Sequence, residues 1–391
     1  MKIISVNAGS SSLKFKLFDM PKEKLIVSGL IEKIGDQKAI FSLIYGTTKK
    51  EAIMPVLNHQ QAVKLLLESL QINKIINNLE EIKGVGHRIV QGGELFKDSV
   101  ILTEENILKI ESLNDLAPLH NYANVLGIKA FEKIIPNIFQ VGVFDTTFHQ
   151  TISKEVFSYA IPYEWYQKYK IRKYGFHGIS YKYVSNRTSE ILSKKDLKII
   201  VCHAGNGVSL CAIDSNKSVD TSMGFTPLEG VPMGTRSGNI DPTIVEFISH
   251  KENKSIEEIM NILNKKSGFL GVSGVSNDAR DIEMSLQNGN KRSLLAHDLQ
   301  IKKIVDYIGS YYFLLKGIDA LVFTAGIGEN SLLFRKNIIQ RLSFLGVYLD
   351  DEFNNSKGER IISTPSSFFK VLVIPTNEEI EIVREVFRIK N

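Results

Sequence analysis

Two strand–loop–strand segments, far apart in the chain, share one construction. The first is "ISVNAGSSSLKFKLFD", in which residues 7–12 join two apolar runs. The second is "IIVCHAGNGVSLCAID", in which residues 203–207 join two more. Both loops contain glycine and small polar residues, so their backbone N–H groups can approach a ligand closely. Two such loops predict two halves built alike around a ligand that needs close backbone approach.

Length and composition point to a two-domain globular protein. A chain of 391 residues is longer than a single hydrophobic core usually accommodates. Its apolar content of 43% and charged content of 23% are ordinary for globular proteins. The 48 basic and 43 acidic residues are spread along the chain without a basic stripe, which argues against nucleic-acid binding. No signal-peptide core and no run of 18 apolar residues occurs, so we expect no membrane association and a cytoplasmic location.

Hydrophobic patterns predict both strands and helices. Four strands fill roughly the first 50 residues, and helical spacing covers about 58–78, 243–264 and 293–316. A buried strand before "AGIGENS" is expected to end in a glycine loop that opens a helix, and "KVLVIP" is expected to precede a C-terminal helix. We interpret Cys202 and Cys211 as buried thiols, although a disulfide is conceivable.

Charged residues stand in glycine-punctuated segments, which favours phosphate chemistry. The P-loop pattern and a complete G-x-G-x-x-G are absent, so hairpins and helix N-termini would hold the phosphates. Arg88, Asp145, His177 and Arg236 fall in such segments. Each could instead be a satisfied polar residue at a strand end. Together, however, two arginines and a histidine supply the positive charge that phosphoryl transfer needs.

A magnesium site is predicted, and a zinc site is not. Mg²⁺ takes few carboxylates and keeps several waters, which suits Asn7 and Glu378 in "PTNEE". The histidines and cysteines lack metal-ligand spacing.

From end to end the chain resembles the acetate kinase family, within the acetate and sugar kinase/actin superfamily. The resemblance runs through "NAGSSSLK", "GHRIVQGG", "APLHN", "VFDTTFHQT", "YGFHGIS", "HAGNG", "MGTRSGNIDP", "FTAGIGENS" and "PTNEE". It implies an α/β protein with two duplicated actin-like (ribonuclease H-like) domains, each a mixed sheet flanked by helices, with the active site in the interdomain cleft. The expected domains are 1–150 with about 378–391, carrying the acetate site, and 151–377, binding the nucleotide.

The resemblance also implies roles for individual residues. Asn7 and Glu378 match the metal ligands, with Glu379 a competitor for the second position. Asp145, His177 and Arg236 match catalytic residues: Asp145 the acid/base or metal-organising carboxylate, and the other two the groups that stabilise the transition state. The residues that match substrate-binding positions are Arg88 for the carboxylate, Val90, Leu119, Phe176 and Pro227 for the acetyl methyl, and His120. Those that match nucleotide-binding positions are Lys14, His203, Ala204, Gly205, Asn206, Gly207, Asp278, Ala279, Arg280, Gly326, Ile327, Gly328, Glu329 and Asn330.

The expected activity is reversible, direct in-line transfer of a phosphoryl group from ATP to acetate, giving acetyl phosphate and ADP, with Mg²⁺ (alternatively Mn²⁺) and a homodimer. Alternatives are a propionate or butyrate kinase on the same fold and a non-kinase nucleotide-binding protein of the actin or chaperone type. The last would have no need for Arg88 or for the pair His177 and Arg236. The chain departs from the usual family pattern at Gln91, Ile179, Asn239 and Ala279, and none of these changes removes a charged catalytic group.

Overall fold

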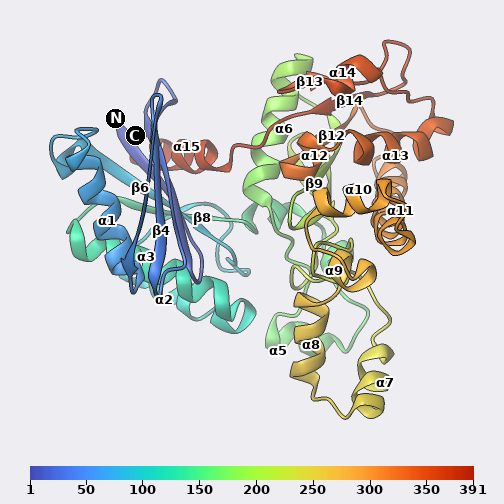
Figure 1. The fold of residues 1–391 in the computed structure, drawn as a ribbon, viewed down its shortest axis with the longest axis horizontal. Coiled ribbons are helices and arrows are strands. Elements are labelled where there is room, and N and C mark those ends of the chain that lie inside the picture. Colours follow the sequence, from blue (N-terminus) through green and yellow to red (C-terminus); the bar gives the residue numbers. More distant parts are fainter. The chain divides into compact units, whose positions relative to one another are not determined.

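The computed structural model describes residues 1–391, except for the side chains of Pro118 and Leu119. The chain forms two compact units (Figure 1). Unit 1 comprises Met1–Gln150 and Asn377–Asn391, and unit 2 comprises Thr151–Thr376. The C-terminal helix is therefore part of the same unit as the N-terminal strands.

Unit 1 is built on an eight-stranded mixed sheet. Strand β1 lies near its middle, antiparallel to β2 on one side and parallel to β6 on the other, and β6 is parallel to β8. The strands in spatial order are β5 (Thr48–Val56), β4 (Asp36–Tyr45), β3 (Lys24–Glu32), β2 (Ser12–Asp19), β1 (Lys2–Ala8), β6 (Ile82–Ile89), β8 (Gln140–Phe144) and β7 (Val100–Ile101).

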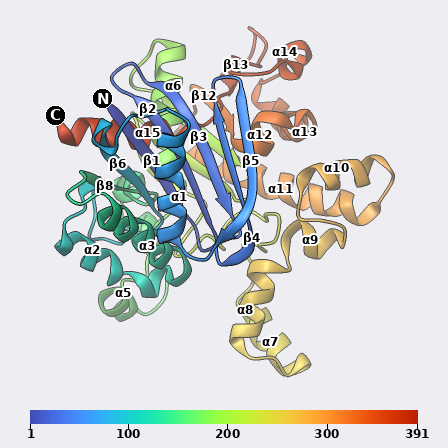
Figure 2. The same ribbon diagram turned by 60° about the vertical axis from the view of Figure 1, so that its left-hand side comes forward.

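Helices cover both faces of this sheet, as Figures 1 and 2 show. Val85 of β6 belongs to one apolar core with Leu66 of α1 (His59–Ile72) and Phe131 of α3 (Pro118–Ile134). Its neighbour Gly86 points the other way: a Cβ there would lie 2.4 Å from Ile382 of α15 (Glu378–Lys390). Successive strand residues face opposite sides, so α15 packs on the face opposite α1 and α3. Helix α2 (Glu104–Glu111) packs against α3.

Unit 2 repeats the central arrangement on a six-stranded mixed sheet. Strand β9 is antiparallel to β10 and parallel to β12, as β1 is to β2 and β6. The strands in spatial order are β11 (Lys217–Thr221), β10 (Val208–Asp214), β9 (Lys198–Ala204), β12 (Ala320–Thr324), β14 (Lys370–Val373) and β13 (Arg360–Ile361). The predicted α/β class with two mixed sheets flanked by helices is confirmed.

The helices of unit 2 correct two predictions. The helix expected over 243–264 is two helices, α7 and α8, because Asn253 adopts a left-handed conformation (φ 49°) and Ser255 forms a capping box with Glu258. The glycine loop expected after β12 is itself a short helix, α12. The helices are α4 (Lys154–Phe157), α5 (Tyr163–Tyr169), α6 (Gly178–Leu192), α7 (Thr243–Glu252), α8 (Ile256–Lys265), α9 (Gly268–Ser273), α10 (Ala279–Gln287), α11 (Lys291–Leu314), α12 (Ala325–Asn330), α13 (Leu332–Leu342) and α14 (Asp351–Asn355).

The two cysteines are free and buried, as interpreted from the sequence. Cys202 is paired with Leu210 across β9 and β10, and Cys211 is the next residue, so the two thiols face opposite sides of the sheet. Burial raises the pKa of both thiols, which keeps them protonated and unreactive.

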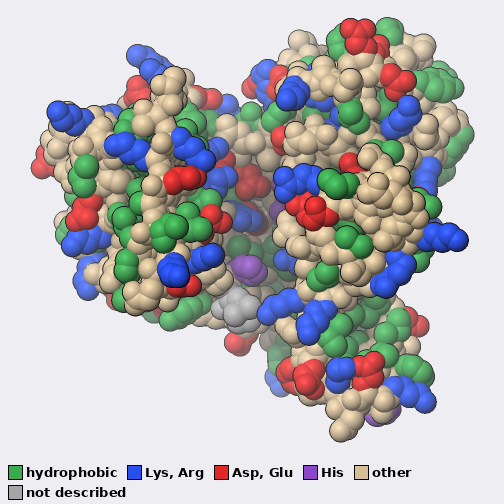
Figure 3. Space-filling view, in the orientation of Figure 1, with side chains coloured by type: hydrophobic (Ala, Val, Ile, Leu, Met, Phe, Trp, Pro, Cys, Tyr) green, Lys and Arg blue, Asp and Glu red, His purple; other side chains and the backbone are tan. Residues whose placement is uncertain are grey.

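The surface carries mixed charge. Lys and Arg side chains alternate with Asp and Glu over the face seen in Figure 3, without a one-sign stripe. None of the helices in the described part of the chain combines the length and apolar character needed to cross a membrane.

Candidate active site

The predicted groups of unit 1 lie where parallel strands end. Arg88 and Val90 lie at the end of β6, and Asp145 directly follows β8. Arg88 pairs with Asp145 through two parallel bonds: Nε donates to Oδ1 at 3.1 Å, and Nη2 donates to Oδ2 at 2.6 Å. The Asp145 side chain is 2% exposed and that of Arg88 21%. One edge of the guanidinium is thus fixed by Asp145, and the opposite Nη1–Nη2 edge keeps donors for a second carboxylate.

Two asparagines of α3 hold the segment that follows Arg88. Asn124 accepts a bond from the Val90 backbone N–H (3.2 Å) and donates to the carbonyl of Ala8 at the end of β1 (2.8 Å). Asn121 exchanges two bonds with the backbone of Gln91, at 3.1 and 2.9 Å. These buried amides fix the ends of β1 and β6 relative to one another. The sequence analysis did not single them out, because asparagine in a helical segment carries no specific signal.

Glu378 has the properties of a cation ligand. It is the first residue of α15, and its half-buried carboxylate has no hydrogen bond or ion pair within the described part of the chain. Burial raises the pKa of Glu378, and the nearby Asp145 and Glu379 carboxylates add to this, against the opposite effect of Arg88 and Lys14. A half-buried carboxylate that lacks a direct partner is stabilised by a bound cation. The side chain therefore fits the role of a metal ligand.

The Glu379 carboxylate, unlike that of Glu378, forms ion pairs with two lysines. Its Oε1 lies 2.5 Å from Lys14 Nζ, and its Oε2 lies 3.1 Å from Lys16 Nζ. Burial opposes ionisation, but the two lysines together lower the pKa of Glu379. Of the two glutamates, Glu378 is thus the better candidate ligand. Asn7 lies opposite Lys14 in the β1–β2 ladder, on the same side of the unit as these residues.

No group of three or more His, Cys, Asp or Glu side chains able to hold a metal by itself occurs among the described residues. Such a group suits zinc or calcium, whereas Mg²⁺ is commonly held by one or two protein oxygens, waters and substrate phosphates. Asn7 and Glu378 fit this second type of site.

In unit 2, His177 and Arg236 face the same glycine. A Cβ on Gly207 would lie 3.3 Å from His177 Nε2 and 3.8 Å from Arg236 Nη1. His177 adopts a left-handed conformation (φ 58°) just before α6. Its Nδ1 lies 2.8 Å from Ser209 Oγ, and its ring stacks on His203 with centroids 4.0 Å apart. The imidazole is therefore held in one orientation with Nε2 toward Gly207.

Arg236 is a cation without a counter-ion in its unit. Its side chain makes a weak hydrogen bond from Nη1 to the sulfur of Met233 at 3.7 Å, and burial lowers the Arg236 pKa. No carboxylate forms an ion pair with it among the described residues. A half-buried guanidinium of this kind attracts an anion, and a phosphoryl group is the anion that the sequence predicts here.

Unit 2 contains a cavity of about 690 Å³. Gly205 and Asn206 from the β9–β10 loop, the start of α10 and the helix α12 all reach it. The predicted nucleotide residues that line the cavity are Gly205, Asn206, Asp278, Ala279, Arg280, Gly326, Ile327 and Asn330. The lining residues that sequence reasoning missed are Gly234, Phe269, Asn277, Glu283 and Ser331.

Asp278 and Arg280 form a fixed rim of the cavity. Asp278 caps α10 by accepting from the Arg280 backbone N–H (2.9 Å), and it also accepts from the Arg280 guanidinium at 2.5 Å. The hydrogen bonds from Arg280 lower the Asp278 pKa to about 2. The Arg280 side chain is 88% exposed, so its remaining donors can reach a ligand.

Hydrogen bonds join the other predicted nucleotide residues to neighbouring segments of unit 2. The His203 ring accepts or donates at Ser180 Oγ (2.9 Å), which also bonds Thr376 Oγ1 (2.8 Å). Glu329 accepts from the Thr376 backbone N–H at 3.1 Å. Arg335 of α13, which is buried, donates to the carbonyl of Gly328 of α12 at 2.8 Å. The β9–β10 loop and α12 are therefore tied to their surroundings.

The remaining predicted site residues are divided between the two units. His120 is exposed on α3, and Lys14 is paired with Glu379; both residues belong to unit 1. Phe176 is 3% exposed and Pro227 half-buried, both in unit 2. Ala204 and Gly207 bracket the β9–β10 loop. The side chain of Leu119 lies outside the described residues.

Known proteins resemble the chain over its whole length. The model of the Acetokinase family matches residues 2–384. An acetate kinase from Phytoplasma mali is 91% identical over 391 residues, all of both chains. The crystal structure of the Porphyromonas gingivalis acetate kinase matches with a TM-score of 0.95 at 43% identity, covering 100% of each chain. A propionate kinase from Francisella tularensis matches with a TM-score of 0.94 at 41% identity, covering 98% of each. The resemblance stated from the motifs is confirmed, and this chain belongs to the Acetokinase family.

Proposed function

We propose that this protein transfers the γ-phosphoryl group of ATP to acetate, reversibly, giving acetyl phosphate and ADP. One acetate oxygen forms a bond to the γ-phosphorus while the bond from that phosphorus to the bridging β–γ oxygen breaks. The electron pair leaves with ADP. Acetate is already ionised at pH 7, so the step needs no general base. The protein's task is to align the oxygens and to stabilise the charge that develops.

The observation that carries the proposal is the paired placement of His177 and Arg236 at Gly207, which directly follows two residues of the cavity lining, Gly205 and Asn206. Positive groups fixed before the substrate arrives stabilise the transition state without reorganising. In the proposed reaction, the Arg236 guanidinium and His177 Nε2 contact the equatorial oxygens of the transferring group. The bond between His177 Nδ1 and Ser209 fixes the ring for this contact.

Arg88 is proposed to hold the acid. Its Nη1–Nη2 edge binds the acetate carboxylate, and Asp145 keeps the guanidinium in plane from the other edge. Although burial works against the charge, the Asp145 and Glu378 carboxylates raise the Arg88 pKa, so the arginine stays cationic. Val90, Phe176 and Pro227 are proposed to surround the methyl group.

Asn7 and Glu378 are proposed to hold Mg²⁺, which when bound neutralises phosphate charge and orients the phosphate chain. The nucleotide is proposed to occupy the 690 Å³ cavity of unit 2. Dependence on Mg²⁺, the homodimer and the cytoplasmic location stay predictions from the family resemblance.

Propionate is the alternative acid, because one of the structural relatives is a propionate kinase. A pocket lined by apolar side chains discriminates against one methylene by only about 10- to 200-fold. A non-kinase nucleotide-binding protein is not favoured, since the whole chain matches the Acetokinase family.

The test measures both directions. With Mg-ATP, ADP formation should require added acetate and stop when EDTA removes the metal. With acetyl phosphate and ADP, ATP should form. ATP turnover that is independent of acetate, together with no ATP synthesis from acetyl phosphate, would refute the proposal.

A further inference from the structure

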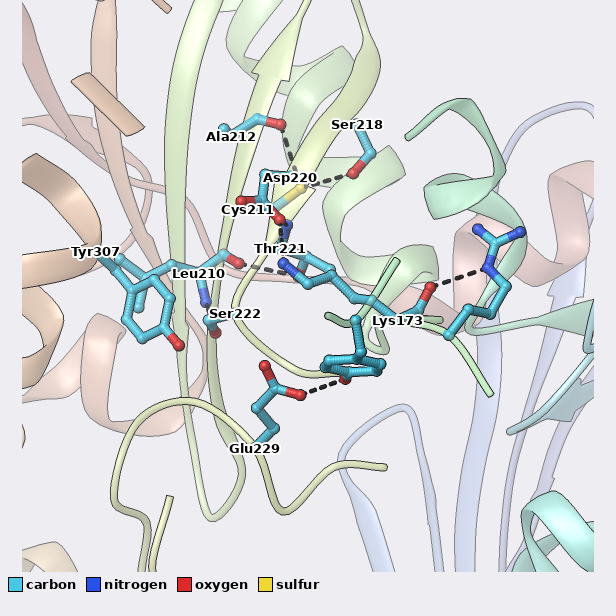
Figure 4. Close-up of polar contacts among 12 residues, drawn as sticks. Lys173, Leu210, Cys211, Ala212, Ser218, Asp220, Thr221, Ser222, Glu229 and Tyr307 are labelled. Atoms are coloured by element: carbon cyan, nitrogen blue, oxygen red, sulfur yellow. Dashed lines mark hydrogen bonds and ion pairs between the residues drawn. The ribbon is translucent and has the colours of Figure 1, made fainter. Parts of the chain in front are cut away.

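The loop that carries Pro227 is closed by a single tyrosine hydroxyl. We call residues 225–229 the Pro227 loop. The backbone N–H of Phe225, at its start, donates to the Tyr159 hydroxyl oxygen at 2.8 Å. The same hydroxyl donates to the carboxylate of Glu229, at the end of the loop. Figure 4 shows the Glu229 carboxylate with the dashed line of this bond. Both ends of the loop are therefore joined to one atom that belongs to neither.

Backbone hydrogen bonds also join the start of this loop to the turn that carries Phe176. The carbonyl of Gly224 accepts the backbone N–H groups of Tyr174 and Gly175, at 3.1 and 3.3 Å. The rings of Tyr174 and Phe225 lie 6.3 Å apart. Just upstream, Lys173 forms an ion pair of 2.6 Å with Asp220, which Figure 4 also labels. Phe176 and Pro227 thus stand on two segments that are bonded together.

The packing leaves no room for a side chain inside this arrangement. A Cβ on Gly224 would lie 1.7 Å from Glu229 Oε2 and 2.2 Å from the Tyr159 hydroxyl oxygen. Only glycine allows the hydroxyl and the carboxylate to lie against the backbone here. Burial and the Glu229 carboxylate raise the Tyr159 pKa, so the hydroxyl keeps its proton.

We propose that Tyr159 and Glu229 are positioning residues that set the length of acid the enzyme accepts, by fixing the Pro227 loop against the turn that carries Phe176. The inference rests on the proposed function, in which Phe176 and Pro227 surround the acyl group. Neither Tyr159 nor Glu229 contacts the substrate. They act by keeping the wall of the acyl pocket from yielding to an added methylene.

A rigid wall and a yielding wall have different kinetic consequences. A rigid pocket rejects an extra methylene by about 10- to 200-fold in kcat/KM. If the Pro227 loop can move outward, propionate gains room while acetate loses contact. The preference for acetate then falls, and KM for ATP stays constant because the nucleotide cavity lies on other segments.

The experiment compares kcat/KM for acetate and propionate in the wild-type enzyme and in Tyr159→Phe, which keeps the ring and removes the hydroxyl. We expect the acetate-to-propionate ratio to fall by about 10-fold, with KM for ATP changed less than about twofold. Glu229→Gln keeps an acceptor oxygen and should retain the wild-type ratio. Glu229→Leu removes the acceptor and should behave like Tyr159→Phe.

The matched control is Tyr163→Phe, four residues away, whose hydroxyl bonds Lys154 on the surface (2.8 Å) and should leave the ratio unchanged. A merely structural role for Tyr159 would lower stability and reduce both efficiencies equally. An unchanged ratio in a folded Tyr159→Phe, or, if that variant does not fold, equal ratios in Glu229→Gln and Glu229→Leu, would overturn the inference. A wild-type protein that phosphorylates neither acid would instead refute the proposed function.

Discussion

Replacing Arg236 with methionine should remove most of the activity and little of the stability. The guanidinium has no carboxylate partner among the described residues, and burial lowers its pKa, so the folded protein gains little from its charge. An arginine that stabilises phosphoryl transfer is worth 10³- to 10⁵-fold in kcat. Here His177 and the predicted metal share that task, so we expect the lower end, about 10³-fold. This equals about 4 kcal/mol of transition-state free energy.

The assay measures kcat and both KM values by ADP formation, and the midpoint of thermal unfolding. We expect each KM within about threefold of wild type, because a group used only in the transition state lowers kcat alone, and a midpoint within about 3 °C. Arg187→Met, which removes an exposed guanidinium of the same unit, is the control and should keep full activity. A rise in KM with unchanged kcat, or a loss of activity that follows a loss of folded protein, would refute the assignment.

Three further results are expected. Arg88→Ala should raise KM for acetate by roughly 100-fold and leave KM for ATP near wild type, since the arginine binds only the acid (one lost bidentate pair); equal rises in both would contradict its role. Glu378→Gln should raise the Mg²⁺ concentration needed for half-maximal activity without lowering thermal stability, because it removes a half-buried charge that has no direct partner among the described residues; an unchanged Mg²⁺ requirement would count against Glu378 as the ligand. His87, 2% exposed, has its pKa lowered by burial to about 4 and stays neutral in the folded protein. In the unfolded chain the His87 imidazole binds a proton near pH 6.5. The contribution of His87 to the free energy of unfolding is therefore present above pH 6.5 and is lost as the pH falls to about 4, by about 3 kcal/mol in all. Urea unfolding between pH 7 and 4.5 should show a shallower loss for His87→Gln than for the wild type, and equal slopes would contradict the reasoning.

The duplicated plan could be predicted from local sequence alone. The glycine and small polar residues at 7–12 and 203–207 indicate a tight loop without any knowledge of distant contacts. Each of these loops joins an antiparallel pair of strands at the middle of a sheet. The division of 243–264 into two helices was missed, although residues 249–255 contain no apolar side chain and so interrupt the helical pattern. The Ser255–Glu258 capping box was a readable signal for it.

The supports of the site were harder to predict, because they depend on contacts between distant segments. Asn124 acts through Ala8, more than a hundred residues away, and Arg335 through Gly328. Phe269 reaches the cavity only because α9 packs beside α11. Tyr159 lies between α4 and α5, and its local sequence did not indicate a contact with the Pro227 loop. The motifs identified the residues that are expected to contact substrates. The residues that hold those side chains and loops in place form no recognisable local sequence pattern.

Direct transfer of a phosphoryl group to a small carboxylic acid, with acetate preferred, is the activity that we propose for this chain. The most direct measurement incubates the protein with Mg-ATP and acetate, propionate or butyrate in turn, traps the acyl phosphate with hydroxylamine, and compares kcat/KM. We expect one trapped acyl group per ADP formed, with the highest efficiency for acetate. ADP formation without any trapped acyl group, whichever acid is present, would contradict it.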